Sequence, residues 1–160
     1  MIESFLMKNY IDLNVCRYQG ELFKESITHI DSGSATFIRN FMHSNIAKHI
    51  DKGTIMQESI SLDKVFKKYI EEYGNRKYGR TKYRPQAMYW IGYIYRYWCE
   101  LHNISSSSVY KIINGSKMNI LYEPYHTMSP EKAISRINKA SNNNIESEDY
   151  LKSLMRAIYL

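Results

Sequence analysis

Cysteine, proline and glycine are scarce in this sequence of 160 residues, which contains two Cys, three Pro and seven Gly. The two cysteines, Cys16 and Cys99, form no Cys-x-x-Cys pair, which argues against a disulfide framework and against a four-cysteine zinc site. So few cysteines predict a reducing, cytoplasmic location. The low Pro and Gly content excludes a collagen-like or linker-like chain.

Long apolar runs are also missing. The most apolar stretch, residues 87–99, contains Arg96 and is shorter than the roughly 20 residues that cross a bilayer. The first seven residues carry an acid where a signal peptide needs basic residues. Hydrophobic residues make up 44% and charged residues 24% of the chain, as in ordinary globular proteins. We therefore expect a soluble protein with one core.

Tyrosine and, in the middle third of the chain, positive charge are abundant. The sequence has 15 Tyr, and its net charge is +6. By segment the net charge is −1 for residues 1–60, +7 for residues 61–120 and zero for residues 121–160. The excess centres on residues 76–84, which hold Arg76, Lys77, Arg80, Lys82 and Arg84. Such a cluster meets phosphate, an acidic protein surface or only water.

Apolar residues at helical spacing predict an irregular all-α domain. Ser61 and Gly74 mark the start and end of one helix, and Pro85 fits the first turn of another. The helix over residues 85–102 is apolar around most of its circumference, so we expect it to be central. The fold class is therefore a compact domain of five or more helices around a central aromatic-rich helix. The expected helices cover residues 37–50, 61–73, 85–102, 106–113, a stretch from residue 130, and residues 147–158.

The N-terminal residues carry a weaker pattern. Residues 13–18 fit a short strand, and residues 21–30 fit one or two helical turns. We therefore divide the chain into residues 1–31, a segment whose structure the sequence does not decide, and residues 32–160, the helical domain.

Signatures of catalysis are missing from the sequence, which has no Gly-rich phosphate loop, nucleophile elbow or zinc-binding His-Glu-x-x-His. Cys99 and His102 lie one helical turn apart, which can activate a thiol. We favour the structural interpretation, a small core residue and a His at a helix end. His43 and His49 point to different faces of one helix, so a metal site is not expected there. The sequence predicts a protein that is not an enzyme and has no cofactor or metal.

A helix, a short break at residues 103–105 and a second helix are the layout of a helix-turn-helix. In that motif the second helix presents short polar side chains at its N-terminus to bases or phosphates. The alternative is that the serines cap and solvate a short surface helix. The candidate nucleic-acid contacts are Ser106, Ser107, Ser108, Tyr110 and Lys111.

Aromatic residues around the basic segment favour a binding surface. Tyr and Arg carry hot spots in protein interfaces and also stack on nucleic-acid bases. Burial in a core explains most tyrosines at helical spacing, but it explains Tyr78 and Tyr83 least well. The candidate partner-binding residues are Arg76, Lys77, Tyr78, Arg80, Lys82, Tyr83 and Arg84.

Several segments resemble a family of small helical bacterial proteins. Members of this family are encoded beside toxin-like genes, often of the ADP-ribosyltransferase type, and are regarded as antitoxins. The resemblance covers roughly residues 32–137 and implies no residue roles. It rests on residues 37–42, 88–98 (MYWIGYIYRYW), 104–106 and 122–127, followed by Pro130, Glu131, Ala133 and Ile134.

These observations predict a non-enzymatic antitoxin or immunity-type protein. It neutralises a cognate toxin by direct binding, and the resemblance implies a toxin of the ADP-ribosyltransferase type. The excess positive charge suits an acidic toxin surface. The alternative is a helix-turn-helix regulator that binds operator DNA, either instead or as a second role of the same antitoxin. A structural protein of a phage or mobile element is a third class. The sequence leaves the oligomeric state open.

Overall fold

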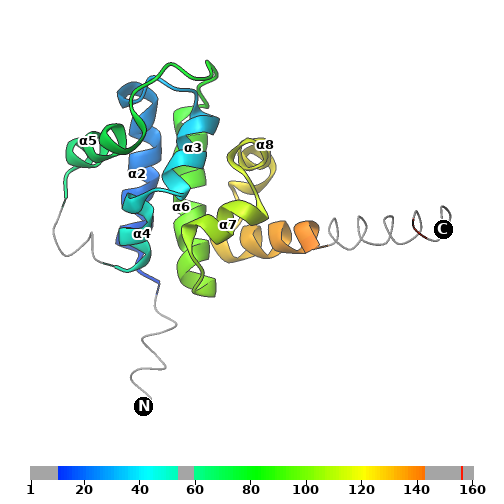
Figure 1. The fold of residues 1–160 in the computed structure, drawn as a ribbon. Coiled ribbons are helices and arrows are strands. Elements are labelled where there is room, and N and C mark those ends of the chain that lie inside the picture. The colour runs from blue at the N-terminus through cyan, green and yellow to red at the C-terminus, as the bar shows by residue number, and fades with distance from the viewer. Residues whose placement is uncertain (1–10, 54–59, 143–155, 157–160) are drawn as a thin grey trace, which may run out of the picture.

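The computed structural model describes residues 11–53, 60–142 and 156, and every regular element in these residues is a helix (Figure 1). The predicted all-α class is confirmed. Two long helices, α2 (Leu13–His29) and α6 (Pro85–His102), lie side by side and run in opposite directions. Around them lie α3 (Ser34–Met42), α4 (Asn45–Asp51), α5 (Leu62–Tyr73), α7 (Ser106–Ile112), α8 (Gly115–Tyr125) and a helix over residues 130–142.

The central helix is α6, as its apolar sequence predicts. It packs against α2, α7 and α8, and its buried residues surround most of its circumference. Trp90 is 8% exposed and Trp98 is fully buried. Pro85 lies in the first turn, and Asn103 ends the helix in the left-handed conformation. None of the described helices combines the length and the apolar character needed to span a membrane.

Residues 13–18, whose pattern fits a short strand without deciding the structure, form part of a helix. These residues begin α2, whose N-cap is Asp12 with its side chain accepting from the Asn14 N–H. The helix buries side chains at helical spacing, and its Phe23 ring packs edge-on against Phe37 of α3 with centroids 5.4 Å apart. Since α2 belongs to the same core as the later helices, the core does not divide at residue 31.

Two helix boundaries also differ from the prediction. The helix expected over residues 37–50 is divided into α3 and α4, because Ser44 caps a new helix by accepting from the Ala47 N–H. The helix expected over residues 106–113 ends at Ile112 as α7, and the side chain of Asn114 caps the unexpected helix α8. The helix expected over residues 147–158 lies outside the described residues, apart from residue 156.

Candidate functional site

The basic loop, residues 74–84, connects α5 to α6 and lies at one end of the domain (Figure 1). Its backbone docks on the connection between α2 and α3. The Gly33 N–H donates to the Tyr78 carbonyl at 2.8 Å, and the Ser34 N–H donates to the Thr81 carbonyl at 2.9 Å. These hydrogen bonds between residues far apart in sequence hold the middle of the loop in one shape.

Two side chains of the loop complete this docking. Lys82 Nζ donates to the Ile30 carbonyl and, at 2.6 Å, to the Ser32 carbonyl. Burial lowers the pKa of Lys82, and the neighbouring Asp31 opposes this shift. Asn75 accepts from the Asp31 N–H at 2.9 Å and donates to its carboxylate at 3.1 Å. Lys82 therefore anchors the loop, a structural role that the sequence did not predict for this candidate partner contact.

The α6 end of the loop contacts α8. Arg84 pairs with Glu123, and its guanidinium carbon lies 5.3 Å from the centroid of the Tyr122 ring. Both side chains of the ion pair are more than half exposed, so the pair adds little stability. The Tyr83 hydroxyl lies 3.4 Å from Ser116 Oγ. Arg84 and Tyr83 are therefore attached to the domain, and Arg84 remains accessible.

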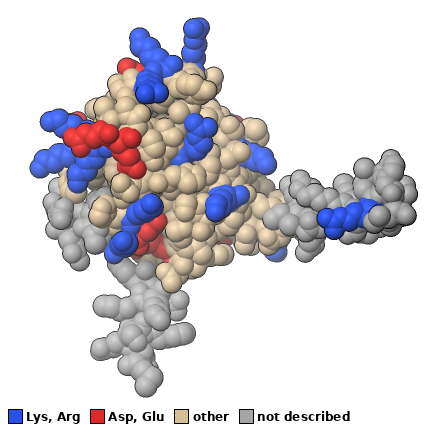
Figure 2. All heavy atoms as spheres, viewed as in Figure 1, with Lys and Arg blue, Asp and Glu red and all other residues tan. Residues whose placement is uncertain are grey.

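The remaining candidates of the loop project from the domain. Arg76, Lys77 and Arg80 are exposed and make no side-chain hydrogen bond or ion pair within the described ranges. Tyr78 is 69% exposed. Figure 2 shows Lys and Arg side chains standing out from this end of the molecule. The loop thus presents three cations and an aromatic ring on an anchored backbone.

The helix-turn-helix candidates lie on α7, where an internal carboxylate occupies the helix N-terminus. The Ser106 N–H and hydroxyl donate to Asp51 at 3.0 and 2.6 Å, and Ser106 is 1% exposed. Ser105 Oγ accepts from the Ser108 N–H at 3.2 Å. The prediction that Ser106 contacts nucleic acid is therefore wrong, and the capping alternative describes Ser105.

The other candidates on α7 stay partly accessible. Ser108 and Lys111 are exposed, whereas Ser107 and Tyr110 are half-buried. The Tyr110 ring packs edge-on against His43, just past the end of α3. The basic loop docks its backbone at the opposite end of α3, roughly 14 Å away for nine residues. Tyr110 and the docked backbone of the loop therefore lie at opposite ends of α3.

Arg96 is the centre of a buried network that the sequence analysis missed. It is 1% exposed, and its three nitrogens donate to Gln19 Oε1 at 2.9 Å, Asp51 Oδ1 at 2.8 Å and Ser106 Oγ at 2.9 Å. The partners belong to α2, α4 and α7, so one guanidinium ties three helices to α6. The signal in the sequence was a lone Arg within an apolar helix, since a buried charge requires partners.

The cysteines show no sign of activation. Burial raises the pKa of the Cys99 thiol to about 11, whereas a nucleophilic cysteine needs a lowered pKa. His102 is exposed, and its ring lies edge-on to Trp98. Burial likewise raises the pKa of Cys16 to about 12. Within the described ranges, no three His, Cys, Asp or Glu side chains are grouped to hold a metal ion.

A pocket of about 450 Å³, which we call the aromatic pocket, lies between α2, α6 and α8. The Trp90 and Tyr122 rings meet edge-on at 5.9 Å, and His126 stacks on Tyr122 at 4.5 Å. Tyr89 and Lys24 also line this pocket. Because Arg84 lies over the Tyr122 ring, this pocket adjoins the basic loop.

Comparisons with protein-family models, with curated proteins and with solved structures find no match for this chain. Function is therefore inferred from the chemistry of the surface. Its two most distinctive features are the exposed cations of the basic loop and the aromatic pocket beside them.

Proposed function

We propose that the protein is a non-enzymatic antitoxin of the immunity type, which neutralises a cognate toxin by direct binding. The observation that carries the proposal is the basic loop. Its backbone is pinned to the domain, while the side chains of Arg76, Lys77 and Arg80 are exposed and form no hydrogen bond or ion pair with the residues that the structure describes. The Tyr78 side chain is likewise exposed. A fixed backbone loses little conformational entropy when a partner binds.

The aromatic pocket supports the same proposal. Trp, Tyr and Arg are the residue types that dominate the binding energy of protein interfaces. Trp90 and Tyr122 form a concave wall, and Arg84 joins this wall to the basic loop. In the proposed complex an apolar side chain of the toxin enters the pocket, and acidic side chains meet the loop.

Charge indicates the chemistry of the toxin surface. The net charge of +7 in residues 61–120 complements an acidic surface and accelerates association more than it deepens affinity. A toxin of the ADP-ribosyltransferase type agrees with the resemblance of residues 32–137. Binding across the nucleotide pocket of such a toxin would block its activity.

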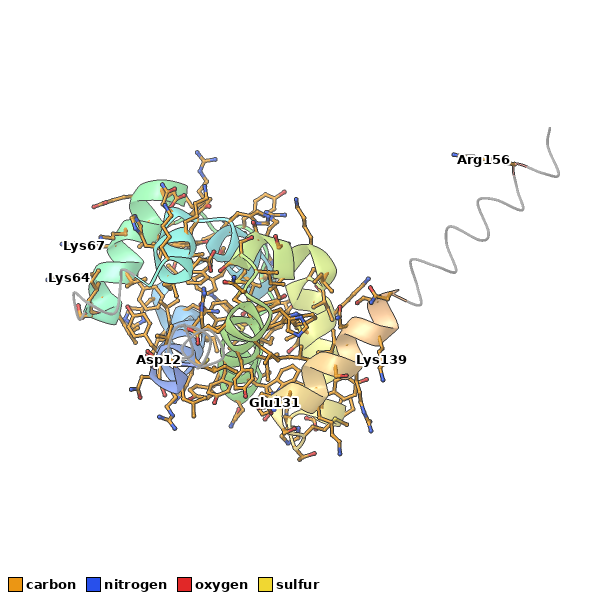
Figure 3. All side chains as sticks on the ribbon, turned by 90° about the horizontal axis from the view of Figure 1, so that it is seen from below. Asp12, Lys64, Lys67, Glu131, Lys139 and Arg156 are labelled. Carbon is orange, nitrogen blue, oxygen red and sulfur yellow. The ribbon has the colours of Figure 1, made fainter. Side chains whose placement is uncertain are left out.

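The test replaces Arg76, Lys77 and Arg80 together by Gln and measures association with the product of the neighbouring gene at two salt concentrations. We expect wild-type co-purification, with association of the triple variant slowed roughly tenfold at low salt and less salt-sensitive. The matched control replaces Lys64, Lys67 and Lys68 by Gln, which removes the same charge from the exposed face of α5. Figure 3 shows Lys64 and Lys67 pointing away from the domain.

The control variant should associate faster than the loop variant. Equal slowing of both variants would assign the effect to net charge and reject the loop as the contact surface. If wild-type protein shows no interaction with the neighbouring gene product, the antitoxin proposal is wrong.

A DNA-binding regulator is the second candidate, and the observation in its favour is that exposed Arg and Lys side chains also suit phosphates. The geometry of α7 disfavours it, because Asp51 occupies the N-terminus of that helix and Ser106 is buried. A gel-shift titration on the protein's own promoter tests this candidate, and we expect weak binding. Tight, sequence-specific binding without any interaction with the neighbouring gene product would replace the antitoxin proposal.

A further inference from the structure

A second and smaller hollow, which we call the polar pocket, opens between α3, α5 and the basic loop. Its volume is about 180 Å³. Apart from Gly74, every residue that lines it has a side chain able to form hydrogen bonds. It therefore differs from the aromatic pocket and is suited to a small polar group. The side chains that matter here are Ser32, Thr36, Arg39, Asn40, Arg76 and Tyr78.

Two guanidinium groups line the polar pocket without a carboxylate partner. Arg39 comes from α3 and Arg76 from the basic loop, and neither forms an ion pair within the described part of the chain. Two acids lie near this pocket. The Glu72 carboxylate accepts from the Asn45 N–H at 3.2 Å, and the Asp31 carboxylate accepts from Asn75 Nδ2 at 3.1 Å. Two guanidinium groups that line one pocket and are not paired with carboxylates create a positive potential there, which favours binding of an anion.

A buried hydroxyl lines the same pocket. Ser32 is 5% exposed, and its Oγ makes no hydrogen bond of good geometry. Its side chain still interacts with the Tyr69 hydroxyl, which accepts from Asn40 Nδ2 at 3.2 Å. Burial raises the pKa of Tyr69, and hydrogen bonding by the Asn40 and Ser32 side chains opposes this shift. The Ser32 hydroxyl therefore keeps hydrogen-bonding capacity for a ligand at this pocket.

We propose that the polar pocket binds the phosphoryl group of a small phosphate monoester. A phosphomonoester carries a charge of about −1.5 to −2 at neutral pH, which the guanidinium groups of Arg39 and Arg76 balance. Guanidinium groups bind such oxyanions in bidentate fashion. Thr36, Asn40 and Ser32 supply further donors.

Volume sets how much of the ligand is enclosed. Sites for whole drug-sized ligands measure roughly 300–1,000 Å³, and this pocket is smaller. It therefore holds the phosphoryl group, while the organic part lies outside, against the exposed Tyr78 ring. A nucleic-acid backbone has phosphodiesters with a single charge and no terminal phosphoryl group to insert. Arg76 and Tyr78 also belong to the surface proposed for the toxin, but phosphate binding is measured without the toxin, so the two proposals are tested separately.

The experiment titrates the full chain by calorimetry with inorganic phosphate, phenyl phosphate, dimethyl phosphate and benzoate. We expect one saturable site for inorganic phosphate, tighter binding of phenyl phosphate, and weaker binding of the diester and the carboxylate. Arg39→Gln and Arg76→Gln should each weaken phosphate binding about tenfold. The matched control is Arg80→Gln, which removes the same charge from the same loop outside the pocket and should leave affinity nearly unchanged.

Ser32→Ala separates a ligand contact from a structural role. It should weaken phosphate binding while changing the unfolding temperature of the free protein only slightly, since the hydroxyl makes no hydrogen bond of good geometry in the free protein. The proposal is overturned if inorganic phosphate shows no saturable binding, if Arg80→Gln weakens binding as much as Arg39→Gln, or if the diester binds as tightly as the monoester. Displacement of phosphate by duplex DNA at comparable concentration would assign the pocket to nucleic acid instead.

Discussion

Arg96 and the arginines of the basic loop have opposite surroundings in one molecule. Arg96 is 1% exposed, and all three of its nitrogens donate to protein oxygens. Arg76 and Arg80 are exposed and have no such partners within the described ranges. Burial of a charge is tolerated only when the charge is paired, whereas an exposed charge needs no partner for the fold to be stable. The number of internal partners therefore distinguishes a structural cation from one available for binding.

The largest expected effect comes from breaking the buried side of this comparison. Asp51→Ala leaves the Arg96 guanidinium buried without its carboxylate and removes the acceptor at the start of α7. We expect the free energy of unfolding to fall by about 3–5 kcal/mol, measured by urea denaturation. Glu123→Ala, which breaks the exposed pair with Arg84, is the control and should cost less than about 1 kcal/mol. Equal losses would show that burial does not set the strength of these pairs.

A smaller loss of stability is expected from a substitution that pushes α2 away from α6. A Cβ atom at Gly92 would lie 2.5 Å from the Gln19 carbonyl oxygen, and Gln19 links that helix to Arg96. Gly92→Ala should therefore destabilise the protein by about 1–3 kcal/mol, although Ala favours helices over Gly by about 1 kcal/mol. Gln86→Ala, on the exposed start of the same helix, should stay within about 0.5 kcal/mol of wild type in the same urea measurement. A stabilised Gly92→Ala variant would contradict this account of the helix contact.

Lys82 and Arg80 repeat the comparison inside the basic loop. Lys82→Met removes the ammonium that donates to two backbone carbonyls, so we expect a loss of about 1 kcal/mol. Arg80→Met removes a cation without an internal partner and should change stability by less than about 0.5 kcal/mol. Thermal unfolding of both variants gives the measurement. A similar loss for both would mean that the loop cations do not differ in their structural role.

Local signals made parts of the fold predictable. Ser61 caps α5, Gly74 ends it and Pro85 starts α6, because each residue acts on the backbone beside it. The apolar circumference of α6 likewise predicted its central position. The sequence does not decide residues 13–18, because two apolar positions, Leu13 and Val15, mimic the alternation of a strand over a very short span.

The polar sites could not be predicted in the same way, because their partners are distant in sequence. The Gln19 and Asp51 side chains lie 77 and 45 positions from Arg96, and the carbonyls bound by Lys82 lie 50 and 52 positions away. Composition located the basic loop. Which of its cations form internal hydrogen bonds or ion pairs depends on how the loop packs against the α2–α3 connection and α8.

The smallest expected effect is a change in pH dependence at the junction of α2 and α6, where the Asp12 N–H donates to the Glu100 carboxylate at 2.8 Å. Burial raises the pKa of Glu100 above its ordinary value of 4.5, and the Asp12 N–H and Arg96 oppose this shift. The native state therefore binds more protons than the unfolded state just above that pH, so the free energy of unfolding falls as pH rises through this window. Glu100→Gln keeps an acceptor for the Asp12 N–H but removes the titration, so it should flatten this slope in urea denaturation between about pH 4.5 and 7. Glu123→Gln, at an exposed carboxylate, is the control and should keep the wild-type slope. An unchanged slope in Glu100→Gln would show that the Glu100 carboxylate is not the source of this pH dependence.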